Sequence, residues 1–113
     1  ERTRDKGHML AALQRSGLLP SGVNDQLEQV PVMTPELCRA IHMYLATSRA
    51  WIVMANLDDV IGEVTQMNLP GTLDAYPNWS RKLSLSLEEL QQDARVQMLA
   101  AAVRTLRSPA ATP

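Results

Sequence analysis

At 113 residues with 45% apolar content, the chain is one globular domain or a part of one, and it begins with Glu1 rather than Met, as expected of a fragment. A net charge of −1 argues against a nucleic-acid binder, which would carry a basic face. The lone Cys38 fits a reducing compartment, and no apolar stretch approaches the roughly 20 residues of a membrane span. We therefore expect neither nucleic acid nor a membrane as a partner.

The first half of the chain is expected to be helical. A short apolar face opposite a charged one indicates a helix over residues 2–16, which Gly17 ends. Residues 20–33 are typical of a connection, with one helical turn around 24–28. A second helix is predicted over 34–48, because its first residues, Thr-Pro-Glu, supply a cap, a proline at the first helical position and a carboxylate at the positive end of the helix dipole.

The second half begins with the only convincing strand. Residues 51–55, Trp-Ile-Val-Met-Ala, form the unbroken apolar run of a strand buried on both faces in a parallel sheet. Residues 57–62 resemble one helical turn closed by Gly62. A Ser-Leu-Glu-Glu capping box begins a last helix over 86–106, and the tail 108–113 is expected to fray. The inner stripe of that helix is predicted to be Leu87, Leu90, Ala94, Leu99, Val103 and Leu106.

Residues 66–83 form a long loop without helical or strand periodicity, and loops of this length are often functional. Pro70-Gly71 fits the centre of a turn in which glycine takes a positive φ. Such a turn would fix the amide of Asn68, with one acceptor and two donors, near an aromatic ring, and sugars need both kinds of contact. The alternative is a purely structural loop that folds back on the core, with Trp79 as a buried anchor.

Other candidates for chemistry are weak. Asp58 and Asp59 are neighbours, and neighbours on a helix point about 100° apart, so they cannot oppose each other as acid and base and are interpreted as helix-start charges. His8 and His42 have no partner at metal-ligand spacing, and Cys38 is interpreted as a small core residue. No catalytic residue, metal or cofactor is predicted in this stretch.

The order of the elements indicates an α/β fragment that is mostly helical. A helix, a doubly buried strand, a functional-looking loop and another helix make one unit of an α/β barrel or an open α/β sheet. In barrels the loops after the strands build the active site, and the loop 66–83 follows the strand 51–55 in this way. The chain is therefore expected to be the end of a larger enzyme.

Three pieces of the sequence resemble the C-terminal region of the bacterial 4-alpha-glucanotransferases, also called amylomaltases. They are LDDVIG at 57–62, QMNLPGT at 66–72 and YPNWSRKL at 76–83. The resemblance covers roughly residues 1–95. It implies that residues 1–107 are the last helix-strand-helix portion of a (β/α)8 barrel, with 66–83 at its active-site face.

The resemblance also implies a function. The complete protein would be a cytoplasmic enzyme that moves α-1,4-glucan segments between maltodextrins by a retaining mechanism, with its catalytic carboxylates upstream of this stretch. Asn68, Pro70 and Gly71 match the family loop beside the sugar cleft and are the expected substrate-binding residues. The chain alone is expected to be inactive, to need the rest of the barrel, and to self-associate through the open edges of 51–55.

Two other functions are weighed against this one. The chain could be a stand-alone helical interaction or sugar-binding module without catalysis, which would reuse the same loop. A helix-turn-helix regulator in residues 1–48 is disfavoured, because that segment lacks a basic recognition helix.

Overall fold

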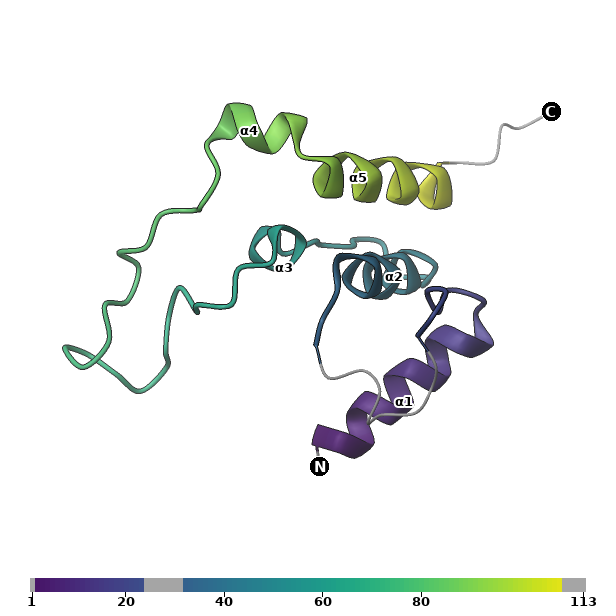
Figure 1. Cartoon of the computed structure of the whole chain (residues 1–113), viewed down its shortest axis with the longest axis horizontal. Coiled ribbons are helices and arrows are strands. Elements are labelled where there is room, and N and C mark those ends of the chain that lie inside the picture. Colours follow the sequence, from purple (N-terminus) through teal and green to yellow (C-terminus); the bar gives the residue numbers. More distant parts are fainter. Residues whose placement is uncertain (1, 24–31, 109–113) are drawn as a thin grey trace.

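A computed structural model describes residues 2–23 and 32–108 of the chain. Its helices are α1 (Arg2–Arg15), α2 (Pro35–Ala46), α3 (Leu57–Ile61), α4 (Leu87–Gln92) and α5 (Ala94–Arg107) (Figure 1). The described residues contain no strand, so the chain is mostly helical. The helical turn predicted at 24–28 and all but the first residue of the tail 108–113 lie outside the described residues.

Helix α2 is the centre of the fold, with α1 on one side and α3 and α5 on the other (Figure 1). Leu10 and Leu13 of α1 pack against Leu37 and Ala40 of α2, and all four side chains are at most 4% exposed. Partly buried residues surround this core, namely Met9, Leu18, Leu19, Val23 and Ile41. The apolar face predicted on the first helix is therefore the face that packs.

Local start and stop signals act as the sequence predicts. The side chain of Thr34 accepts a hydrogen bond from the Leu37 amide at 3.2 Å, and Pro35 occupies the first turn of α2. Helix α3 begins after Asn56, which caps the Asp58 amide, and ends at Gly62, whose φ of 78° is left-handed. These short signals involve only neighbours in sequence, so they hold whatever surrounds the helices.

The segment 51–55 is not a strand in this structure, and the predicted burial on both faces is wrong for the chain by itself. Trp51 is 98% exposed, and Ile52 and Met54 are also exposed. A strand exists only through hydrogen bonds to a neighbouring strand, and no segment among residues 2–23 and 32–108 supplies one. An apolar run is therefore left facing solvent.

The connection after α2 is nevertheless held in place by one residue of α5. The Arg107 guanidinium donates hydrogen bonds to four carbonyl oxygens, those of Ala46 at 3.5 Å, Ser48 at 3.1 Å, Ala50 at 2.6 Å and Trp51 at 3.1 Å. Carbonyls at and beyond a helix end have no partner within the helix, and a charged donor binds them strongly. The last turn of α5 thus fixes the path of the chain up to the start of 51–55.

The single helix predicted over 86–106 is wrong at one point, because Asp93 divides it. The capping box of Ser86 and Glu89 forms as expected, but Asp93 takes φ −66° and ψ 123°, and its carboxylate accepts the amides of Arg95 and Val96. An Asp side chain competes for backbone amides and prefers a cap to a helix interior. As a result, only part of the predicted inner stripe is buried. Leu90 and Leu99 are buried, whereas Leu87 is 73% and Leu106 40% exposed.

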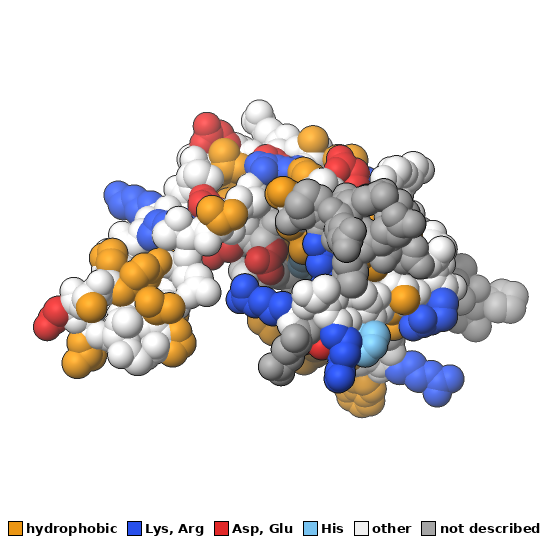
Figure 2. Space-filling view, turned by 60° about the horizontal axis from the view of Figure 1, so that its bottom comes forward, with side chains coloured by type: hydrophobic (Ala, Val, Ile, Leu, Met, Phe, Trp, Pro, Cys, Tyr) orange, Lys and Arg blue, Asp and Glu red, His pale blue; other side chains and the backbone are white. Residues whose placement is uncertain are grey.

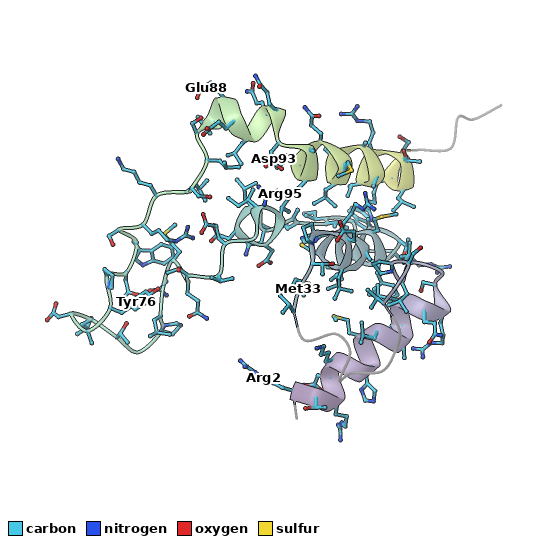
Figure 3. All side chains as sticks on the ribbon, in the orientation of Figure 1. Arg2, Met33, Tyr76, Glu88, Asp93 and Arg95 are labelled. Carbon is cyan, nitrogen blue, oxygen red and sulfur yellow. The ribbon has the colours of Figure 1, made fainter. Side chains whose placement is uncertain are left out.

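Arg95 joins this helix junction to α3 (Figure 3). Its guanidinium binds both carboxylate oxygens of Asp93, with Nε–Oδ1 at 3.0 Å and Nη2–Oδ2 at 2.7 Å, and its Nη1 donates to the Ile61 carbonyl at 2.6 Å. The hydrogen bonds from the Arg95 side chain lower the pKa of Asp93 to about 2.

This lowered pKa predicts a specific dependence on pH. A carboxyl with a depressed folded-state pKa stabilises the fold above its unfolded pKa of about 3.9, and this stabilisation is lost as pH falls toward about 2. The urea midpoint of the wild-type chain should therefore exceed that of the Asp93→Asn variant at pH 6, and this difference should shrink as the pH falls from 6 to about 2. A constant difference between the midpoints over that range would contradict a stabilising charge on Asp93.

Candidate functional site

The loop 66–83 projects from the helices between α3 and α4 (Figure 1). Hydrophobic side chains gather on this projection (Figure 2), where Leu73 is 88% and Trp79 is 73% exposed. The alternative in which Trp79 anchors the loop to the core is therefore wrong for this structure. The loop is kept in shape by its own hydrogen bonds and by contacts at its base.

The Pro-Gly turn forms as the sequence predicts. The Thr72 amide donates to the Leu69 carbonyl at 3.3 Å, and Gly71 between them has φ +83°. Apart from Gly71 and its two chain neighbours, no described residue has a heavy atom within 4 Å of the position that a Cβ on Gly71 would occupy. A side chain there would be opposed by the backbone conformation and not by crowding.

Asn78 is the residue that closes this turn. Its Oδ1 accepts the Leu69 amide at 2.8 Å, and its Nδ2 donates to the carbonyl of Thr72 at 3.1 Å and to the Thr72 hydroxyl at 3.0 Å. One side chain thus satisfies backbone groups at both ends of the turn. Sequence reasoning missed this role, since the bond to Leu69 spans nine residues and no local pattern announces it.

The two limbs of the loop are also joined below the turn. The Trp79 amide donates to the Met67 carbonyl at 2.9 Å, and the hydroxyl of Tyr76, labelled in Figure 3, donates to the Gln66 carbonyl. Asn68 lies between these links and the turn. Its side chain is partly buried and makes no hydrogen bond to another residue within 2–23 or 32–108.

Charges hold the base of the loop against α3. Arg81 lies 3.0 Å from a carboxylate oxygen of Asp58 and 3.4 Å from one of Glu63. These contacts are ion pairs by distance, and the buried guanidinium nitrogens make no hydrogen bond within the described part of the chain. Glu63 also accepts the Ser84 amide at 3.0 Å, and its bonds to Ser84, followed by the charge of Arg81, lower its pKa. Asp58 lies in the first turn of α3, as its interpretation as a helix-start charge requires.

The other sequence candidates do not assemble into a centre. Cys38 is buried, burial raises the pKa of its thiol, and its Sγ lies 3.3 Å from the Asp59 carbonyl oxygen. His42 is buried beside it, with Nδ1 2.9 Å from the Cys38 carbonyl, whereas His8 is exposed on α1. Across residues 2–23 and 32–108, no three His, Cys, Asp or Glu side chains lie together as metal ligands would.

Comparison with known proteins identifies the family. A sequence profile described as 4-alpha-glucanotransferase matches residues 1–88, which include the whole of the loop 66–83. The chain belongs to the 4-alpha-glucanotransferase family. The match ends within α4, so α5 lies beyond it.

Individual 4-alpha-glucanotransferases support this assignment. The chain is 32% identical over 106 residues to one from Mycobacterium tuberculosis (strain ATCC 25618 / H37Rv), with 88% of this chain and 14% of that protein covered. It is 35% identical over 88 residues to one from Haemophilus influenzae, with 77% and 12% covered. The chain thus spans about one seventh of the length of the curated relatives it matches. No solved structure matches it.

None of the helices in the described residues combines the length and the apolar character that crossing a membrane requires.

Proposed function

We propose that the chain is the C-terminal part of a cytoplasmic 4-alpha-glucanotransferase and that its loop 66–83 forms one wall of the α-1,4-glucan site. The observation that carries the proposal is the closed turn at 69–72 beside an Asn68 amide that no described residue uses. A sugar hydroxyl both donates and accepts, as an amide does, so the two groups can pair. The family to which the chain belongs gives the substrate class.

Pro70 and Gly71 contribute shape to this site. Proline fixes φ at the second position of the turn, and glycine takes the positive φ at the third. Asn78 then ties both ends together, so the loop has little freedom to lose when glucan binds. We assign Asn68 the direct contact with a sugar hydroxyl, and Pro70 and Gly71 the support that keeps its backbone in place.

We further propose that residues 1–107 complete a (β/α)8 barrel made mainly by the preceding part of the enzyme. The exposed apolar run 51–55 supports this, because a buried barrel strand needs neighbours on both sides and this run has none within the described residues. The loop 66–83 would then stand at the carboxyl end of that strand, where barrels build their active sites. When isolated, the chain is expected to self-associate through the same run.

The proposed mechanism is retaining and uses carboxylates that precede this stretch. Such a mechanism needs a nucleophile and an acid/base about 5–5.5 Å apart. Asp58 and Glu63, which meet at Arg81, are held there as ion pairs. The chain therefore binds and shapes the site, and the remainder of the enzyme breaks the glycosidic bond.

The Asn68→Ala variant tests the substrate contact in a glucanotransferase that contains residues 1–113. Removing a hydrogen-bond partner of a sugar hydroxyl costs roughly 1–3 kcal/mol, or about one to two decades in kcat/KM. The loss should appear in maltotriose disproportionation while the melting temperature stays nearly unchanged. Wild-type kinetics for Asn68→Ala, or a loss that only follows unfolding, would remove the contact.

Asn78→Ala is the matched comparison on the same loop. Because Asn78 closes the turn, its loss should release the Leu69 amide to fast hydrogen exchange, whereas Asn68→Ala should leave that amide protected. A similar release in both variants would mean that Asn68 is structural as well.

A sugar-binding module without catalysis is the second candidate, and one observation favours it. The bonds that close the turn and join the limbs all run between residues 66 and 79, so this part of the loop keeps its shape without the helices. Titration of the 113-residue chain with maltoheptaose separates the two functions. Micromolar affinity without the preceding barrel would favour the module, and weak binding would favour one wall of a larger site.

A further inference from the structure

Trp79 is unusual in both its backbone and its side chain. Among the described residues it is the only one other than glycine with a positive φ, at 60°. Its side chain is nevertheless large, apolar and 73% exposed. Bulky residues at positive φ are uncommon, and such outliers persist where the surroundings impose them, often at ligand sites. Within the chain alone, neither the strained backbone of Trp79 nor the exposure of its apolar ring stabilises the fold.

The loop imposes this conformation through bonds on both sides of Trp79. Its own amide donates to the Met67 carbonyl at 2.9 Å, and the preceding Asn78 is fixed by its three bonds to Leu69 and Thr72. The following Ser80 hydroxyl donates to the Pro77 carbonyl at 2.7 Å. The strained residue is therefore clamped within the loop, while its ring remains in solvent.

The same hydrogen bonds place the backbone of Trp79 beside Asn68. Met67 binds Trp79 and Leu69 binds Asn78, so Asn68 lies on the limb directly opposite Trp79. A glucose unit presents hydroxyl groups at its rim and C–H groups on its face. A side-chain amide that no described residue hydrogen-bonds and an exposed indole on adjoining limbs supply the contacts for both.

We propose that the indole of Trp79 is a stacking platform for one glucose unit of the α-1,4-glucan, adjacent to the unit that Asn68 contacts. This inference rests on the proposed function of the loop and adds a residue that determines how the glucan is placed. The positive φ positions the ring, and the ring covers the apolar face of the sugar. Covering roughly 60 Å² of apolar surface corresponds to about tenfold in affinity.

Two substitutions separate the ring from the backbone. Trp79→Gly removes the ring and takes a positive φ without strain, whereas Trp79→Phe keeps an aromatic face and the strain. In a glucanotransferase containing residues 1–113, Trp79→Gly should lower kcat/KM for maltoheptaose by at least about tenfold, or about 1.4 kcal/mol. Trp79→Phe should lose less than about a third of that free energy on the same scale. Leu73→Ala, which trims an even more exposed apolar side chain of the same loop, is the control.

Either of two kinetic results would overturn the proposal. Wild-type kinetics for Trp79→Gly would show that the ring is not used. Equal losses in the glycine and phenylalanine variants would show that the indole makes a specific fit, as in packing against the rest of the enzyme, and does not offer a general sugar face.

A second readout does not depend on turnover. With 5-fluorotryptophan in the enzyme, the resonance that Trp79→Phe removes is that of Trp79, and saturating maltoheptaose should shift it. An unmoved resonance overturns the stacking role. A shifted resonance in an enzyme without transfer activity would sustain the stacking role and refute the proposed function, so the two failures are distinguishable.

Discussion

Residues 1–113 on their own are expected to transfer no glucosyl units and to hydrolyse no glucan. Retaining cleavage requires one carboxylate as nucleophile and one carboxyl that is still protonated as acid. Asp58 and Glu63 converge on Arg81, but the hydrogen bonds with Ser84, followed by the charge of Arg81, lower the pKa of Glu63, which favours its ionised form where an acid is needed. Incubation of the pure chain with maltotriose should therefore release neither glucose nor longer oligosaccharides.

The matched control is the double variant Asp58→Asn, Glu63→Gln. Transfer by the wild-type chain that disappears in this variant would refute the assignment of catalysis to the preceding barrel. Transfer that persists in both proteins would not use the carboxylates that meet at Arg81 and would point to a contaminating enzyme.

Trp51→Ala should destabilise the complete enzyme far more than the chain alone. In the chain Trp51 is 98% exposed, and substitutions at such positions usually change stability by less than about 0.5 kcal/mol. If 51–55 becomes a barrel strand, the same change removes a buried indole and costs on the order of 3–5 kcal/mol. Urea unfolding of both proteins, with and without the substitution, measures the difference.

Leu37→Ala calibrates this comparison. Leu37 is 1% exposed within the contact between α1 and α2, so its truncation should cost about 2–5 kcal/mol in the chain and in the complete enzyme alike. A small cost for Trp51→Ala in both proteins, beside a full cost for Leu37→Ala, would remove the barrel strand from the proposed function.

The helices were predictable where their signals are local. Thr34 and Pro35 begin α2, Ser86 begins α4, and Gly62 ends α3, in each case through bonds to residues at most four positions away. Asp93 was missed because the apolar spacing continues through it, although an aspartate in a helix interior is itself a warning. The segment 51–55 was wrongly predicted as a buried strand. Its apolar run indicates that these side chains favour burial, but it does not indicate whether a neighbouring strand is present.

The candidate site was likewise predictable where its contacts are local, and not where they reach across the loop. The turn at Pro70-Gly71 follows from the conformations open to those two residues, so the sequence predicts it. The closing bonds of Asn78 depend on a side chain that reaches across the loop, and the exposure of Trp79 depends on the whole path of the chain. The contact between Asn68 and a sugar hydroxyl remains a prediction, and the position of Asn68 beside the turn is compatible with it.

Arg107 has a practical consequence for anyone who shortens this protein. The family profile matches only as far as residue 88, which makes that position a tempting place to truncate. A chain cut there would lack the guanidinium that gathers the carbonyls of Ala46, Ser48, Ala50 and Trp51. The profile's boundary therefore falls inside the contacts that hold the helices together, and expression boundaries should be drawn after α5.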